Sequence, residues 1–215
     1  MNKKNLIGIF GGTFDPIHYG HLRMALELQQ CLHLQEVRFI PCQKPVHKKT
    51  VYATPEQRLH MLQLAISQQP TFLLDDREIK RITPSYMVLT LESLKKELGE
   101  ASLCLILGID AFAGLPNWHR WQEIFNLCHI IAVQRPDFTI PSSSQIASIL
   151  QERQITDSHG LQNKPSGYVF LMKSTLLQIS ASDIRHQIAN QKNPRYLLPD
   201  LVLEYIREQQ IYLDA

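Results

Sequence analysis

The chain has 215 residues, of which 44% are hydrophobic and 20% charged, a balance that is ordinary for a folded globular protein. Its 22 Lys and Arg against 20 Asp and Glu leave a formal net charge of +2, too near neutral to indicate a nucleic-acid-binding protein. No apolar run reaches the length of a membrane span, and the apolar segment after residues 1–4 is too short for a signal peptide. We therefore expect a cytoplasmic protein that does not enter a membrane.

Short apolar runs predict the strands of a parallel sheet. They occupy residues 6–10, 37–41, 72–75, 103–108, 130–134 and 168–172. Most of them are continuous rather than alternating, which is typical of parallel strands covered on both faces. Helical patterns lie between them, so the chain is predicted to be α/β: a doubly wound, Rossmann-like parallel sheet with helices on both faces and right-handed crossovers.

The starts of several helices are marked by capping residues or by proline. Gly99 is expected to end the helix that starts at Thr83. A stretch over residues 137–165, rich in serine, glutamine and proline, is predicted to be a variable excursion that holds one amphipathic helix near 144–154. The predicted helix starts are Thr54, Thr83, Ser180 and Pro199.

The four cysteines show no C-x-x-C pairing and no ligand-like clustering with histidine, so we expect reduced thiols. Cys31, Cys104 and Cys128 lie in apolar contexts and are predicted to be core residues. Cys42 follows a predicted strand and is expected to be more exposed.

The most informative segment follows the first predicted strand. Residues 11–21 read Gly-Gly-Thr-Phe-Asp-Pro-Ile-His-Tyr-Gly-His, and a helical pattern begins at Leu22. Backbone N–H groups at a helix start attract phosphate, and glycines let the backbone approach it closely. His18 and His21, three residues apart, can donate hydrogen bonds to phosphate oxygens. The segment therefore predicts a site for a nucleotide triphosphate.

Two better-known phosphate loops do not fit this segment. It lacks the Gly-Lys-Ser/Thr of a Walker loop, and its glycines do not have the G-x-G-x-x-G spacing of a dinucleotide site. For a lone H-x-x-H the better interpretation would be a tight turn with two surface histidines. The strand–turn–helix context of the whole segment favours the phosphate site.

Further polar groups are predicted at the carboxyl ends of the strands, where ligands bind to such sheets. A basic loop with His47 and Lys48 follows the second strand and could close on phosphate, or it could be a solvated loop. Asp110, just after the fourth strand, could hold a ribose hydroxyl or cap a helix. Trp118 could stack on a flat heteroaromatic ring, although tryptophan more often belongs to a core.

The segment Ile-Ser-Ala-Ser-Asp-Ile-Arg at residues 179–185 is the second clear motif. Ser180 alone is explained as a helix N-cap. A helix start with two hydroxyl groups, Ser180 and Ser182, and with Arg185 in its second turn is also a phosphate site, because a guanidinium offers two donors to two phosphate oxygens.

The opening segment resembles the GTFDPxHxGH signature of the nucleotidyltransferase superfamily. The chain is also similar to the bacterial nicotinate-nucleotide adenylyltransferase family, because the motifs of that family occur here in the same order. These are the opening segment, residues 108–110, 115–118 and 135–136, the I-S-x-[ST]-x-x-R helix start and the C-terminal residues 197–212. The similarity runs nearly from end to end. It implies one nucleotidyltransferase domain over residues 1–215, in which the helical part 180–215 completes the ATP site, and transfer of AMP from ATP to nicotinate mononucleotide.

The resemblance also implies residue roles. His18 and His21 would bind the ATP phosphates and stabilise charge at the reacting phosphorus, and Arg185 would act with them on the triphosphate. Tyr86 and Trp118 would flank the pyridine ring. The residues implied to bind ATP or the mononucleotide are Gly11, Gly12, Thr13, Phe14, His47, Lys48, Tyr86, Gly108, Asp110, Trp118, Arg135, Ser180 and Ser182.

The expected reaction is a direct attack of the mononucleotide phosphate on ATP, with Mg²⁺ carried by the ATP phosphates and no metal bound by the protein itself. The expected partners are ATP and nicotinate mononucleotide, with no nucleic acid and no membrane, and the protein could be a monomer or a homodimer. One alternative keeps the chemistry and changes the acceptor, for example to phosphopantetheine. The other is a catalytically silent nucleotide sensor on the same fold; a tRNA synthetase fragment is disfavoured because no lysine-rich KMSKS-like loop is present.

Overall fold

The computed structural model describes residues 5–45, 50–134, 140–141, 144–175 and 177–215. Within them, a parallel sheet has the strand order β3-β2-β1-β4-β5-β7-β6, as predicted for a doubly wound α/β fold. Its strands are β1 (Leu6–Gly12), β2 (Glu36–Pro41), β3 (Phe72–Leu74), β4 (Ser102–Gly108), β5 (His129–Gln134), β6 (Gln154–Ile155) and β7 (Val169–Lys173).

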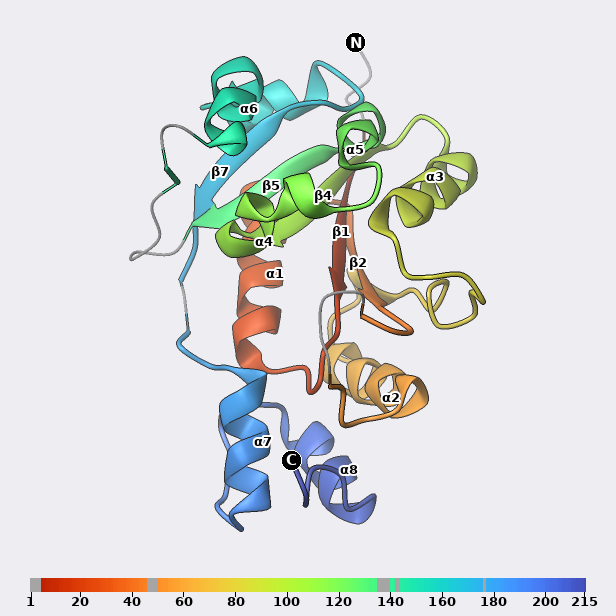
Figure 1. The fold of residues 1–215 in the computed structure, drawn as a ribbon, viewed down its shortest axis with the longest axis vertical. Helices are drawn as coiled ribbons and strands as arrows, with labels where there is room; N and C mark the ends of the chain where they lie inside the picture. The colour runs from red at the N-terminus through yellow and green to blue at the C-terminus, as the bar shows by residue number, and fades with distance from the viewer. Residues whose placement is uncertain (1–4, 46–49, 135–139, 142–143, 176) are drawn as a thin grey trace. The chain divides into compact units, whose positions relative to one another are not determined.

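Helices occupy the connections between these strands (Figure 1). The helices are α1 (Tyr19–Cys31), α2 (Pro55–Ile66), α3 (Met87–Leu98), α4 (Ile109–Ala113), α5 (Trp121–Leu127), α6 (Gln145–Arg153), α7 (Ala181–Ala189) and α8 (Asp200–Glu208), with the 3-10 turns η1 (Leu115–Asn117) and η2 (Ser158–Gln162). The direction of winding changes at β1, because β2 and β3 follow on one side of it and β4 on the other. This switch point is where ligands bind to sheets of this kind.

Internal contacts divide the chain into two compact units. Unit 1 consists of Met1–Gly11, Leu28–Val37 and Tyr86–Ser174. Unit 2 consists of Gly12–Glu27, Arg38–Ser85 and Thr175–Ala215. The sequence-based prediction of a single domain stays a prediction.

Unit 1 contains the central strands. Almost every residue of β4 and β5 is buried, and Leu105 and Ile131 are wholly inaccessible to solvent, as continuous apolar strands covered on both faces require. Helix α3 packs against α5. The excursion 137–165 contributes regular structure where it is described: Ser144 caps α6, and β6 pairs in parallel with β7.

Unit 2 contains α2, which starts with the predicted capping box. The Thr54 hydroxyl accepts a hydrogen bond from the Gln57 N–H at 3.2 Å, and the Gln57 side chain accepts one from the Thr54 N–H at 2.9 Å. Helix α2 packs against α8 and β3. The predicted helix starts at Ser180 and Pro199 are confirmed as the residues that precede α7 and α8.

Two local predictions are wrong. The helix predicted to start at Thr83 begins at Met87, with Tyr86 as an N-cap residue that makes no side-chain cap hydrogen bond. The preceding Ser85 hydroxyl accepts a hydrogen bond from the Gln43 N–H, and Gly99 ends the helix as predicted. Cys31 was predicted to be buried but is exposed, since it is the last residue of α1, whereas Cys104 and Cys128 are buried as predicted.

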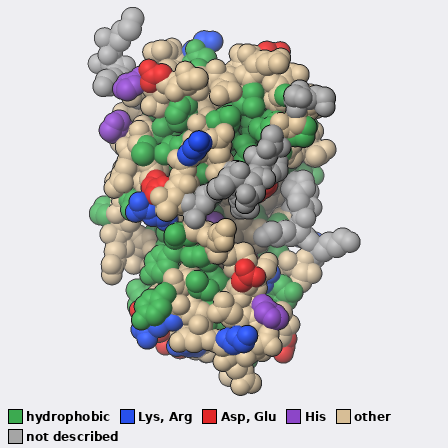
Figure 2. All heavy atoms as spheres, turned by 90° about the vertical axis from the view of Figure 1, so that its left-hand side faces the viewer, with side chains coloured by type: hydrophobic (Ala, Val, Ile, Leu, Met, Phe, Trp, Pro, Cys, Tyr) green, Lys and Arg blue, Asp and Glu red, His purple; other side chains and the backbone are tan. Residues whose placement is uncertain are grey.

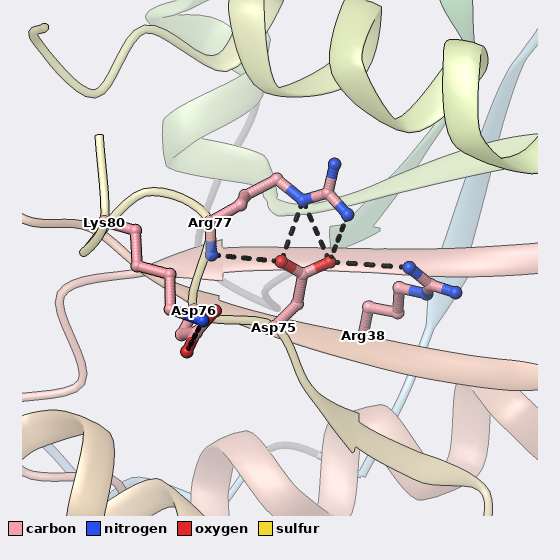
Figure 3. A network of polar contacts seen from close by, with 5 residues as sticks. All are labelled: Arg38, Asp75, Asp76, Arg77 and Lys80. Atoms are coloured by element: carbon pink, nitrogen blue, oxygen red, sulfur yellow. Dashed lines mark hydrogen bonds and ion pairs between the residues drawn. The ribbon is translucent and has the colours of Figure 1, made fainter. Parts of the chain in front are cut away.

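In unit 2 a charged cluster follows β3 (Figure 3). The Asp75 carboxylate accepts bidentate hydrogen bonds from the Arg77 guanidinium at 2.7–2.9 Å. Arg38 Nη1, from β2, lies 3.5 Å from Asp75 Oδ2. The Asp75 N–H donates to the Phe39 carbonyl at 3.0 Å. Asp75 therefore ties the segment after β3 to β2, and its side chain is only 9% exposed.

We expect Asp75→Asn to lower the free energy of unfolding by about 2 kcal/mol, because hydrogen bonds to a mostly buried charged group are worth about 1.5–3 kcal/mol. Urea denaturation measures this change. Asp76→Asn is the matched control: its ion pair with Lys80 is exposed and should contribute less than about 0.5 kcal/mol. Equal losses from the two substitutions would contradict the structural role of Asp75.

Candidate nucleotide-binding site

The turn after β1 is tightly packed in unit 2. Phe14 is buried and has a φ of 49°, in the left-handed region, and its ring lies where a side chain on Gly12 would be: a Cβ built on Gly12 would come within 2.9 Å of it. The same ring meets His21 edge-on, with 5.2 Å between ring centroids. Gly12 thus gives Phe14 the space to reach His21, and a turn without a side chain at this position lets a ligand approach its backbone closely.

The two histidines of the motif lie against each other at the start of α1. The ring centroids of His18 and His21 are 3.7 Å apart, with 29° between the ring planes. A Cβ built on Gly20 would come within 2.9 Å of His18 Nδ1, so glycine is required between the histidines for the His18 ring to adopt this position. The predicted pair of imidazoles is therefore a single packed unit.

His18 is unusual because it is buried, with 6% of its surface exposed. Burial lowers its pKa to about 4, so the imidazole is neutral at pH 7. Among the described residues, its Nδ1 has no hydrogen-bond partner. A buried polar atom in this state is uncommon in folded proteins, and it marks His18 as a candidate for ligand binding.

The start of α7 lies beside the histidines. The Ile179 carbonyl oxygen is 3.6 Å from the position that a Cβ on Gly20 would take. The Ser180 hydroxyl accepts a hydrogen bond from the Asp183 N–H at 3.1 Å, which confirms it as the N-cap of α7. The exposed Ser182 hydroxyl accepts a 3.4 Å contact from Arg185 Nη2. The second motif of the sequence thus lies next to the first.

Arg185 is held by three neighbours in unit 2. Its Nη1 donates a 2.6 Å hydrogen bond to the Asp15 carbonyl oxygen, and its guanidinium lies 4.7 Å from the centre of the Tyr52 ring. Together with the Ser182 contact, these interactions fix the direction of the guanidinium while it stays partly accessible to solvent. A fixed guanidinium beside two histidines can bind the oxygens of a polyphosphate.

Arg58 belongs to this region and was not predicted from the sequence. Its side chain is wholly buried, and it donates hydrogen bonds to the carbonyl oxygens of Thr13 (2.8 Å), Gln43 (2.9 Å) and Ala53 (3.4 Å). It therefore ties the motif turn to Gln43 and Ala53, the first and last residues of the predicted basic loop. The feature of the sequence that could have revealed Arg58 is its place on the same helix face as the buried Met61 and Leu62 of α2.

Unit 1 carries the predicted residues at the ends of its own strands. Gly11 lies near the carboxyl end of β1, and Gly108 ends the adjacent strand β4. Asp110 is exposed in the first turn of α4. The half-buried Trp118 follows η1. Gly11 and Gly108 therefore lie at the ends of two adjacent strands, where ligands bind to sheets of this kind.

One aromatic contact in unit 1 was not predicted. The ring of Tyr86, which precedes α3, stacks on His119 with 4.3 Å between ring centroids and 27° between ring planes. His119 follows Trp118 in the chain, so the segments that carry Tyr86 and Trp118 meet through His119. His47, Lys48 and Arg135 lie outside the described residues.

The described residues contain no group of three or more His, Cys, Asp or Glu side chains placed to hold a metal ion. None of the helices in the described part of the chain is both long and apolar enough to cross a membrane. On the face drawn in Figure 2, lysine and arginine side chains stand singly or in small groups among acidic and uncharged atoms.

The chain is similar to known proteins over most of its length. The cytidylyltransferase-like family model matches residues 9–187. A probable nicotinate-nucleotide adenylyltransferase of Methylococcus capsulatus is 47% identical over 208 residues, which cover 96% of this chain and 99% of that protein. A probable nicotinate-nucleotide adenylyltransferase of Dechloromonas aromatica is 46% identical, over 97% of this chain and 98% of that protein.

Solved structures share the fold. The Plasmodium falciparum nicotinic acid mononucleotide adenylyltransferase in complex with NaAD superposes with a TM-score of 0.74, at 20% identity and over 98% of both chains. The same enzyme in complex with APC gives a TM-score of 0.70 at 19% identity. With the identity and coverage of the bacterial relatives, the chain belongs to the cytidylyltransferase-like family and, within it, to the nicotinate-nucleotide adenylyltransferases.

Proposed function

We propose that this protein transfers AMP from ATP to nicotinate mononucleotide, giving nicotinate adenine dinucleotide and pyrophosphate in NAD biosynthesis. The observation that carries the proposal is the packing of neutral His18 on His21, beside the start of α7 and its fixed Arg185. Relatives that are 40–47% identical over almost the whole chain carry the name of this activity.

The reaction is an in-line displacement at the α-phosphorus of ATP. An oxygen of the mononucleotide phosphate forms the new bond to phosphorus as the bond to the β-phosphate oxygen breaks, and pyrophosphate leaves with that electron pair. The attacking oxygen is already anionic, so no general base is needed. Catalysis is then a matter of positioning and of stabilising the charge that develops on phosphate oxygens.

The residues of unit 2 supply donors for that charge. His18, neutral in the free protein, donates one N–H, and His21 stacks on it and fixes its orientation. Arg185 and Ser182 at the start of α7 bind the leaving phosphates. The remaining contacts proposed for ATP and the mononucleotide come from Gly11, Gly12, Thr13, Phe14, His47, Lys48, Tyr86, Gly108, Asp110, Trp118, Arg135 and Ser180.

The divalent cation of the reaction, which we propose is Mg²⁺, enters as part of the ATP substrate and neutralises its phosphates. We also propose a cytoplasmic enzyme. The four cysteines are free thiols, and two of them, Cys104 and Cys128, are buried, which suits a reducing compartment.

We expect His18→Ala to lower kcat by about 10²–10³-fold, because it removes one donor from the charge that develops in the transition state. Release of pyrophosphate with ATP and nicotinate mononucleotide measures this change. His60→Ala is the control, because His60 is an exposed imidazole on α2 whose ring contacts Tyr205 at a tilt of 48°. Full activity of a folded His18→Ala protein would refute the catalytic role of His18.

Because buried His18 is neutral in the folded protein, the free energy of unfolding should depend on pH. Its folded pKa of about 4 lies below the usual histidine value of 6.5, so the unfolded chain binds a proton that the folded protein does not bind between these values. The stability gained from neutral His18 is therefore complete above pH 6.5 and is lost as the pH falls toward 4. Between pH 7 and pH 5 the wild type should lose about 2 kcal/mol more stability than His18→Asn. Equal losses in urea denaturation would show that His18 titrates normally.

The acceptor is tested by comparing pyrophosphate release with nicotinate mononucleotide, nicotinamide mononucleotide and phosphopantetheine. We expect kcat/KM to be highest with nicotinate mononucleotide. Turnover with phosphopantetheine alone would keep the adenylyl-transfer chemistry and reassign the substrate. Binding of ATP without turnover of any acceptor would favour a nucleotide sensor.

A further inference from the structure

Asp15 joins its own turn to three other segments of unit 2 through its carboxylate and its backbone carbonyl oxygen, and we call this set of contacts the Asp15 junction. One carboxylate oxygen of Asp15 accepts hydrogen bonds from the Tyr212 hydroxyl at 2.7 Å and from the Ala53 N–H at 3.2 Å. The other accepts a hydrogen bond from the Tyr52 N–H at 3.0 Å. The Asp15 carbonyl oxygen accepts the 2.6 Å hydrogen bond of Arg185. The junction thus connects the motif turn and Arg185 with the C-terminal end of the chain.

Tyr212 comes from the segment after α8, close to the C-terminus (Figure 1). It is 4% exposed, its φ of 70° lies in the left-handed region, and its ring lies near Met61, with 4.0 Å between the hydroxyl oxygen and Met61 Sδ. A side chain buried this deeply is fixed by its surroundings. Here the bond to Asp15 is the polar contact that does so.

The Tyr212 hydroxyl acts as a constant donor. Burial, and then the negative charge of Asp15, raise the pKa of the Tyr212 phenol far above its usual value. The hydroxyl therefore stays protonated at neutral pH and donates its hydrogen bond to Asp15. A short hydrogen bond to a buried carboxylate is among the stronger polar contacts in a protein.

The junction holds Arg185 on two sides. The Asp15 backbone supplies the acceptor for Nη1, and Tyr52, whose N–H is bonded to the Asp15 carboxylate, supplies the ring that lies against the guanidinium at 4.7 Å. A change in the position of Asp15 would therefore move both groups that orient Arg185. Misplacement of a binding group by about 1 Å can reduce a rate by about 10²-fold.

We infer that Tyr212 is a positioning residue for ATP binding: through Asp15 and Tyr52 it holds Arg185 in the orientation that receives the triphosphate. The inference rests on the role proposed above for Arg185. It assigns to the C-terminal segment a part in the site without any contact between Tyr212 and the substrate.

A double-mutant cycle tests this coupling through the dissociation constant of ATP with Mg²⁺, measured by calorimetry without an acceptor. We expect Tyr212→Phe to weaken ATP binding about 10-fold and Arg185→Ala about 100-fold. The double variant should bind ATP within about 2-fold of Arg185→Ala, because Tyr212 acts through Arg185. Wild-type affinity of Tyr212→Phe, or a further 10-fold loss in the double variant, would overturn the inference.

Tyr205→Phe is the matched control. It removes the same hydroxyl group from the C-terminal part of unit 2, where the centroid of the Tyr205 ring lies 4.5 Å from that of the tilted His60 ring, and it should leave ATP binding unchanged. A kinetic measurement adds a second readout: Tyr212→Phe should raise KM for ATP about 10-fold and leave KM for the mononucleotide within 2-fold. An equal rise in both values would indicate general damage to the fold and contradict the inference.

If Tyr212→Phe does not fold, Tyr52→Leu decides the question. Tyr52 is 44% exposed, so the substitution removes the ring beside Arg185 without opening a cavity in the core, and it leaves the backbone bond to Asp15. Loss of a cation–π contact of this kind should weaken ATP binding about 5-fold. Unchanged affinity would overturn the inference. Because ATP binding is measured without an acceptor, a failure of the proposed transfer to nicotinate mononucleotide would be seen separately.

Discussion

The structure of unit 2 depends on hydrogen-bond partners for the buried backbone N–H and carbonyl groups of its irregular segments. The turn after β1 and the segment before α2 have no strand or helix partners for many of their polar groups, and buried groups without partners are costly. Two charged side chains meet this need. Asp15 accepts bonds from the N–H groups of Tyr52 and Ala53, and Arg58 donates to three carbonyl oxygens. The motif turn is ordered because both side chains are in place.

The fixed turn also positions the two histidines of the candidate site. A fixed turn holds Phe14 against His21, and the lack of a side chain at Gly20 lets His18 stack on His21 in a buried position. Burial keeps His18 neutral, so it is a hydrogen-bond donor and not a permanent cation. Arg185 supplies the fixed positive charge. A neutral donor next to a fixed cation suits the transfer of an AMP group between anions, because charge is stabilised without a proton being moved.

Patterns of neighbouring residues were enough to predict most elements. The apolar runs predicted the parallel sheet, and the capping signals of Thr54, Ser180 and Gly99 are confirmed because each acts on residues within four positions in the chain. The start of α3 was predicted at Thr83, four residues too early, in a segment where the Ser85 hydroxyl accepts a hydrogen bond from Gln43, 42 residues away. Cys31 was placed in the core because its neighbours are apolar, but the end of α1 leaves it exposed.

The sequence by itself determined the fold class, the family and the two motifs of the site, since each depends on local periodicity or on contiguous residues. It did not reveal Arg58, the stacking of Tyr86 on His119, or the bond from Tyr212 to Asp15. Arg58 reaches Thr13 across 45 positions, and the other two contacts join residues 33 and 197 positions apart. No local rule relates an aromatic hydroxyl at the end of a chain to a carboxylate near its start. Only the tertiary structure decided them, because burial selects which polar groups must find a partner and the fold decides which partner is within reach.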